Sequence, residues 1–136
     1  MNFLKSLLPD LSKLFLRMAA GLMLLHGTQK IVNYSEWAPQ FGNPIGIGPE
    51  LSLMLCIFAE FICTIFIMVG LFTRTAAIPL IFNMCIILFI VHAQDPLKDK
   101  ELAALFLLLY LAIFAAGPGS FSIDRFRKKG LDKLIG

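Results

Sequence analysis

Six polar residues interrupt the long apolar stretches of this sequence, and each can exchange a proton or form a strong hydrogen bond. They are Arg17, His26, Lys30, Glu60, His92 and Glu101. Carboxylates pair with cations and handle protons, and imidazoles change charge near neutral pH. Together such groups predict a polar site that binds the head group of a quinone or a small anion, with a carboxyl or imidazole carrying the proton.

Glu60 is the most informative of these residues because an ionisable side chain in hydrocarbon costs at least about 2.5–3.5 kcal/mol. Helical spacing places Cys56, Cys63 and Thr64 on the same face, so the polar atoms form one stripe directed toward other helices. Two interpretations stay open, a proton-handling or ligand-binding carboxyl and a structural carboxyl that fixes helix packing. Arg17 is the predicted ion-pair partner of Glu60, the alternative being that its side chain extends to the inner headgroups.

His26 and His92 fall near the outer ends of their predicted helices, within reach of Gln29, Asp95 and Glu101. Lys30 follows His26 by one helical turn, so these residues predict a shallow polar site that faces outward. Two histidines without a second ligand at helical spacing define no coordination geometry, and the sequence predicts no metal site. The three cysteines are expected to be inert apolar thiols, and Asn83 is expected to form an interhelical hydrogen bond.

The elements that position these residues follow from composition. Of the 136 residues 58% are hydrophobic and only 15% are charged, which excludes an ordinary soluble domain of this size. Charged residues are absent from 75–94 and 102–123, and Glu60 alone interrupts 51–73. These stretches match the roughly 20 residues that cross a bilayer. The prediction is an all-α integral membrane four-helix bundle forming one domain, with spans over 11–32, 50–72, 75–94 and 101–117.

The distribution of cations predicts the orientation. Eight Lys and Arg residues fall on the side that carries both termini, three fall on the other side, and Arg17 lies within a span. The positive-inside rule therefore places both termini in the cytoplasm of a multi-pass protein of the bacterial inner membrane. Residues 1–9 are predicted to form an interfacial helix that breaks at Pro9 and Asp10, and 118–136 a basic cytoplasmic tail. The basic tail suits anionic lipid or an acidic partner, and nothing indicates nucleic acid.

A series of short motifs in order along the chain resembles the DoxX family of small bacterial membrane proteins. The series is Arg17-Met-Ala-Ala-Gly21, His26-Gly27 with Lys30, Glu60, Gly70-Leu-Phe-Thr-Arg74, His92, Glu101, Gly117-Pro-Gly119 and Ser122-Ile-Asp124. The resemblance covers roughly residues 12 to 125. It implies a four-helix bundle in the cytoplasmic membrane. The family includes relatives of the membrane subunit of thiosulfate:quinone oxidoreductase and proteins associated with sulfur-redox or oxidative-stress enzymes.

Three functions follow as hypotheses. In the first, the chain is a membrane subunit or anchor of a redox complex, in which Arg17, His26, Glu60 and His92 hold a quinone. In the second, it is a structural subunit whose polar residues only lock the bundle and whose outer surface binds another membrane protein or a second copy of the chain. In the third, it transports a small solute or protons with Glu60 as the coupling carboxyl, although no inverted repeat is evident. None of them assigns a catalytic residue.

Overall fold

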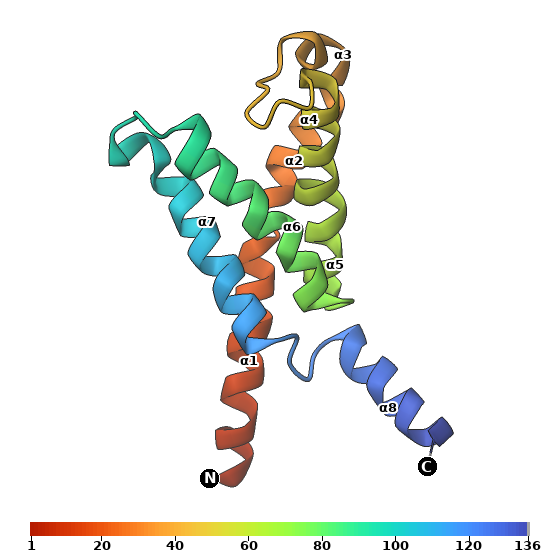
Figure 1. Ribbon diagram of the computed structural model, residues 1–136. Coiled ribbons are helices and arrows are strands. Elements are labelled where there is room, and N and C mark those ends of the chain that lie inside the picture. The colour runs from red at the N-terminus through yellow and green to blue at the C-terminus, as the bar shows by residue number, and fades with distance from the viewer. Residues whose placement is uncertain (136) are drawn as a thin grey trace.

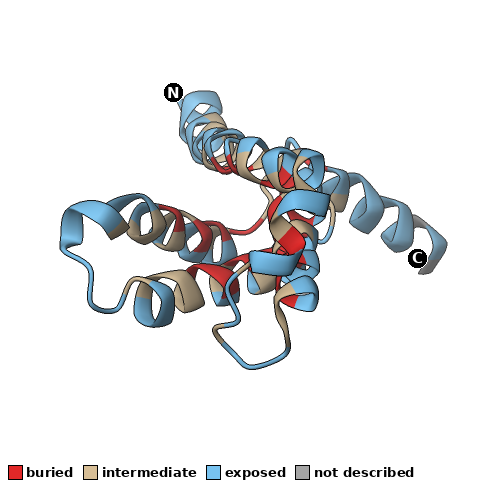
Figure 2. Ribbon diagram, turned by 90° about the horizontal axis from the view of Figure 1, so that it is seen from above, coloured by how far each residue is buried: buried red, intermediate tan, exposed pale blue. Residues whose placement is uncertain are grey.

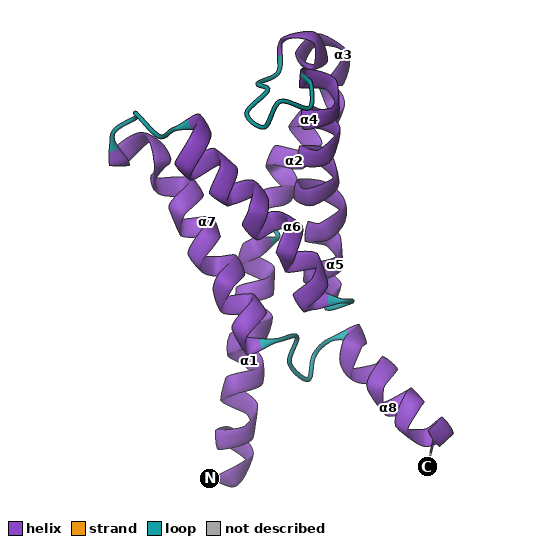
Figure 3. Ribbon diagram, in the orientation of Figure 1, coloured by secondary structure: helices purple, strands orange, loops and turns teal. Residues whose placement is uncertain are grey.

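The computed structural model describes residues 1–135, which form helices joined by turns and loops without a strand (Figure 3). This confirms the all-α prediction. The elements in chain order are α1 (Asn2–Ala20), α2 (Met23–Val32), α3 (Tyr34–Trp37), the 3₁₀ turn η1 (Ala38–Gln40), α4 (Pro49–Ile57), the π-helical segment η2 (Phe58–Cys63), α5 (Thr64–Val69), α6 (Thr73–Ile86), a second π-helical segment η3 (Ile87–Val91), α7 (Leu97–Ala116) and α8 (Ile123–Ile135).

Four long helical segments correspond to the four predicted spans. The first is α1 followed by α2, the second is α4–η2–α5, the third is α6–η3 and the fourth is α7. Two of them, Pro49–Val69 and Thr73–Val91, are long and apolar enough to cross a membrane. The first and fourth segments carry more charge, because α1 and α2 hold several basic residues and α7 begins with Lys98, Asp99 and Lys100.

Large apolar side chains cover the outside of all four long segments. Their exposed fractions include 65% for Leu25, 46% for Phe58, 59% for Phe82 and 66% for Leu108. A soluble protein rarely exposes apolar residues so evenly, because water gives them no favourable contact. Such a surface fits contact with lipid, in agreement with the membrane character predicted from composition.

Small residues allow the helices to approach closely in the core. Ala20, Ala59, Ala76 and Ala77 are buried together with Met23, Ile67, Leu80 and Tyr110. Close approach of backbones at small residues is typical of helix packing in membranes. Figure 2 shows that the buried residues lie on the sides of the helices that face one another, while the outer sides are exposed.

The N-terminal helix is longer than the sequence predicted, and the C-terminal segment contains a helix. A helix break at Pro9 and Asp10 was expected, but α1 continues through Pro9 to Ala20. Pro9 is the eighth residue of α1, an interior position where a proline removes one backbone hydrogen bond and either kinks or breaks a helix; here the helix continues. Residues 118–136 were expected to be a basic tail, and within that stretch residues 123–135 form helix α8. The two termini lie at the same end of the molecule (Figure 1).

Candidate functional site

Glu60 lies in η2, the π-helical segment in the middle of the second long helix, and only 2% of it is exposed. The wider turn of a π-helix is rare and frequently occurs at functional sites. Helix α2 packs directly on this turn at Gly27. A Cβ atom added to Gly27 would lie 2.9 Å from the carbonyl carbon of Glu60 and 3.0 Å from its oxygen. Glycine is therefore required here by the close approach of two backbones.

Both carboxylate oxygens of Glu60 have partners on neighbouring helices. Lys30 Nζ of α2 lies 2.6 Å from Oε2, and Asn83 Nδ2 of α6 donates a hydrogen bond of 3.0 Å to Oε1. Cys56 Sγ in turn donates to Asn83 Oδ1 over 3.3 Å. This confirms the interhelical hydrogen bond expected for Asn83. A charged and hydrogen-bonded network thus joins the first three long segments at the depth of η2.

Arg17 does not pair with Glu60, so that prediction is wrong. Its guanidinium, 2% exposed as a residue, donates to four backbone carbonyls: Ile67 and Met68 at 3.0 Å each, and Pro118 and Phe121 at 2.7 Å each. Two of these carbonyls belong to the last turn of α5, where helical partners run out; Ile67 O also accepts the N–H of Gly70 at 3.1 Å. A planar group with five donors satisfies several carbonyls at once. Arg17 therefore holds together the end of the bundle at which the two termini lie.

A cavity of about 230 Å³ lies beside the Lys30–Glu60 pair, where α2 and η2 face α6, η3 and α7. In Figure 1 the α6–α7 pair diverges from α2 and α4 toward the end of the molecule opposite the termini. Four of the six predicted site residues line this cavity, namely His26, Lys30, Glu60 and His92. The remaining two, Arg17 and Glu101, do not.

Glu101 is exposed on the first turns of α7 and is replaced at the cavity by Asp99. The sequence did not identify Asp99 as a site residue, because α7 begins at Leu97, four residues before the predicted span. The earlier start extends the face of α7 that turns toward His92. The proline at position 96 marks that helix start and was the available signal.

Aromatic rings form one wall of the cavity. His26 meets the ring of Phe106 edge-on, with centroids 6.4 Å apart at an angle of 85°. Phe106 stacks on Tyr110 with centroids 5.9 Å apart. Tyr110 Oη and Thr64 Oγ1, which do not line the cavity, are buried without a hydrogen-bond partner among the described residues. Buried hydroxyls are normally bonded, so these two are polar atoms that a further group can satisfy.

His92 stands at the outer edge of the cavity, with 35% of its side chain exposed. Its Nδ1 lies 2.6 Å from Asp95 Oδ2, one of the partners expected from the sequence. A carboxylate at this position orients the ring and favours a proton on Nδ1, which leaves Nε2 to exchange hydrogen bonds elsewhere. The site thus combines one cation, two imidazoles and two carboxylates around a small space. No group of three or more His, Cys, Asp or Glu residues suited to a metal occurs within residues 1–135.

The fold and this site together define a helical membrane protein with a buried ion pair next to a polar cavity. Comparison with known proteins shows that the chain belongs to the DoxX family, whose model matches residues 12–93. It is 32% identical over 124 residues to an uncharacterized protein of Haemophilus influenzae, an alignment that covers 85% of this chain and 90% of that protein. No solved structure matches the chain.

Proposed function

We propose that this chain is a multi-pass protein of the bacterial inner membrane, a four-helix bundle with both termini in the cytoplasm. Two helices of spanning length and the apolar outer surface of all four long segments support the bundle. The termini share one end with the turn that carries Arg74, and eight of the twelve Lys and Arg residues belong to that end. The positive-inside rule then assigns this end to the cytoplasm.

Within that frame, we infer that the chain is a membrane subunit of a redox complex and binds a quinone head group in the cavity beside Glu60. The observation that carries this proposal is the convergence of His26, Lys30, Glu60 and His92 on one cavity that also has an aromatic wall. Pockets for drug-sized ligands measure about 300–1,000 Å³. A cavity of about 230 Å³ is thus suited to a single ring rather than a larger ligand.

The donor set fits a quinone. A quinone carbonyl is a hydrogen-bond acceptor, and Lys30 and His92 are lining residues that can donate to it. Lys30 donates from Nζ, and His92, whose Nδ1 faces Asp95, donates from Nε2 when its ring carries both protons. Phe106 offers an apolar surface beside them. A bound quinone supplies the redox chemistry, accepting two electrons and two protons, with the electrons delivered by the partner of this subunit. His92 lies at the exposed edge, where its ring exchanges protons with water, and the contact with Asp95 orients that ring.

One observation favours a second function, that of a purely structural subunit. Both oxygens of Glu60 are already bonded, by Lys30 and Asn83, and so the network can lock three helices without any ligand. The two functions differ in what happens when the cavity is altered and the network is left intact. A structural subunit tolerates a change at His92 or Asp99, whereas a quinone site does not.

Extraction of the purified protein tests the proposal. The protein is purified in mild detergent from membranes of a quinone-containing host, and the organic extract is analysed for quinone. We expect close to one quinone per chain in the wild type, and strong depletion in His92→Ala. Lys98→Ala is the matched control because Lys98 precedes the cavity residue Asp99 yet does not line the cavity. Absence of quinone from wild-type protein, or equal retention in both variants, overturns the proposal.

A further inference from the structure

Helix α8 points away from the packed bundle (Figure 1). It carries a stripe of large apolar side chains that are exposed. Phe126, Gly130 and Leu134 follow one another at intervals of four residues, so they lie in line along the helix. Phe126 is 71% exposed and Leu134 is 85% exposed. Such residues are unfavourable in water, and the stripe needs an apolar surrounding.

The rest of α8 is strongly basic. It contains Arg125, Arg127, Lys128, Lys129 and Lys133, against the two acidic residues Asp124 and Asp132. A helix with an apolar stripe, a cationic remainder and low overall hydrophobicity is typical of helices that lie in the membrane interface. Anionic phospholipids attract cations at the inner leaflet, so the charge of α8 complements that surface.

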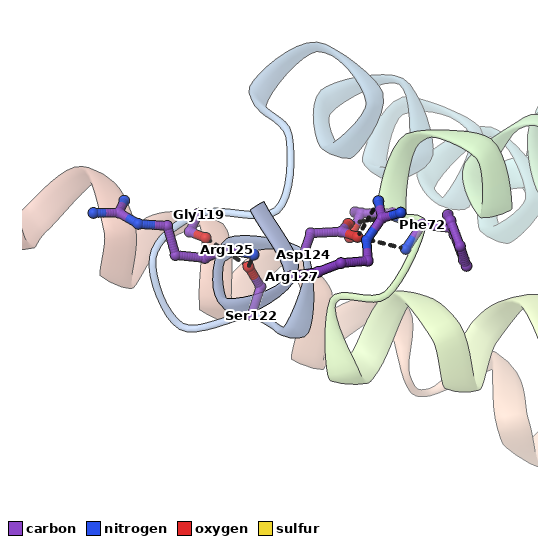
Figure 4. A network of polar contacts seen from close by, with 7 residues as sticks. Phe72, Gly119, Ser122, Asp124, Arg125 and Arg127 are labelled. Atoms are coloured by element: carbon purple, nitrogen blue, oxygen red, sulfur yellow. Dashed lines mark hydrogen bonds and ion pairs between the residues drawn. The ribbon is translucent and has the colours of Figure 1, made fainter. Parts of the chain in front are cut away.

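Asp124 fixes the start of α8 to the bundle. Its carboxylate accepts hydrogen bonds from the backbone N–H of Phe72 at 2.9 Å and of Thr73 at 3.0 Å, and from Thr73 Oγ1 at 3.1 Å. These are the free donors at the start of α6, and so Asp124 caps that helix. Arg127 reaches back to Asp124 and stacks 4.4 Å above the ring centroid of Phe72 (Figure 4). The direction in which α8 leaves the bundle is therefore set by specific contacts.

A cavity of about 530 Å³ separates the first two turns of α8 from the turn between α5 and α6. Four cationic side chains line it: Arg74, Arg125, Arg127 and Lys128. Arg74 and Arg125 each use part of their guanidinium on nearby oxygens, Phe114 O and Ser120 Oγ. Asp124 is the acidic residue in the lining, and its oxygens already bind the start of α6. The cavity therefore has the charge of an anion site.

We propose that α8 lies in the headgroup layer of an anionic leaflet and that this cationic cavity holds the phosphodiester of an anionic phospholipid. Phe126 and Leu134 enter the upper acyl region, while Arg74, Arg125 and Lys128 contact the phosphate. The ligand is a membrane lipid, since the same helix presents both the apolar stripe and the cations. This inference does not depend on quinone binding at the opposite end of the bundle.

Hydrogen exchange of the full chain in nanodiscs tests the proposal. We expect the amides of residues 123–135 to exchange several times more slowly in discs that contain phosphatidylglycerol than in discs of phosphatidylcholine alone. Each lysine near an anionic surface contributes about a fivefold factor to binding. Lys128→Gln/Lys129→Gln should therefore remove most of the added protection. Neither side chain has a partner among the hydrogen bonds and ion pairs of the described residues, so the bundle should stay folded.

Lys98→Gln/Lys100→Gln is the matched control, because it removes two cations from the opposite end of the molecule. We expect it to leave the lipid-dependent protection of α8 unchanged. Equal protection in the two lipid compositions, or an equal loss in both double variants, overturns the proposal. Protection of α8 in phosphatidylcholine discs by inorganic phosphate alone would show a site for a free anion and would also overturn it.

Discussion

Replacing Lys30 by Met is expected to destabilise the protein more than replacing Glu60 by Gln, although both changes break the same ion pair. The reason is unequal access to water, because the Glu60 side chain is 2% exposed and that of Lys30 is 17% exposed. Lys30→Met leaves a buried carboxylate with Asn83 as its remaining partner. Removal of one member of a buried pair costs about 3–5 kcal/mol. Glu60→Gln keeps an acceptor for Asn83 and leaves an ammonium group that can turn toward water, at about 1–3 kcal/mol.

The double variant Lys30→Met/Glu60→Gln provides the sharper comparison. It removes both charges, so it should be more stable than Lys30→Met alone, by about 1–2 kcal/mol. For a chain of this length, 1 kcal/mol corresponds to a shift of about 3–5 °C in the unfolding midpoint. Thermal unfolding in mild detergent, followed by circular dichroism, measures each variant. Lys98→Met is the control, and its exposed side chain predicts a change within about 0.5 kcal/mol.

An additive double variant, in which the two costs simply sum, would refute this reasoning. It would mean that Lys30 and Glu60 do not interact, and that the 2.6 Å contact contributes nothing to stability. The same variants separate structure from ligand binding. If the double variant recovers stability and still fails to retain quinone, the ion pair serves the cavity as well as the fold.

Three further predictions concern other parts of the molecule. Arg17→Lys should lower the unfolding midpoint by about 10 °C or more, because one ammonium group cannot satisfy four carbonyls. Quinone retention per folded chain should stay unchanged. Reduced retention would show that Arg17 also contributes to the quinone site. Gly27→Ala should cost about 1–3 kcal/mol of stability, since the new methyl meets the backbone of Glu60 at 2.9 Å. Gly130→Ala is the control, because its methyl has open space around it and should not destabilise the protein. Equal unfolding midpoints for the two variants would contradict the close packing of α2 on η2. Asp124→Ala should cost about 0.5–2 kcal/mol at neutral pH through loss of the α6 cap. Burial raises the pKa of the Asp124 carboxyl, but hydrogen bonds from Thr73 and Phe72 outweigh this effect and hold the pKa below the ordinary 3.8. The difference in stability between wild type and variant should therefore persist above about pH 4 and vanish as the pH falls further. A stability difference that persists in acid would refute the cap.

The sequence predicted the helices well because hydrophobic patterning and the absence of charge define them directly. The stretches 50–72 and 75–94 correspond to helical segments that end within three residues of those bounds. Predictions from local sequence failed where contacts between distant residues determine the structure. Pro9 was expected to end a helix, but α1 continues through it, since an interior proline can kink a helix without ending it. Asp124 appeared only as part of a motif, because its partners Phe72 and Thr73 are about fifty residues away.

The site was predicted in part. Depth along a helix can be counted from sequence, and the structure brings four of the predicted residues, His26, Lys30, Glu60 and His92, to one cavity. Rotation and reach of side chains cannot be counted in this way. Arg17 and Lys30 belong to the first long segment, one on each side of the level at which Glu60 of the second segment lies. The sequence alone favoured Arg17 as the ion-pair partner of Glu60. Arg17 instead donates to carbonyls in the last turn of α5, which leaves the carboxylate to Lys30.

The most direct test of the proposed function is a titration of the purified protein in nanodiscs with a short-tailed benzoquinone, in wild type, His92→Ala and Lys98→Ala. His92 lines the cavity with 35% of its side chain exposed, and so its removal should leave the fold intact. The quinone account predicts saturable binding at one site per chain. It also predicts that the dissociation constant is at least about tenfold higher in His92→Ala, because one charge-assisted hydrogen bond is lost. The constant should be unchanged in Lys98→Ala. Absence of saturable binding, or the same constant in all three proteins, would contradict it.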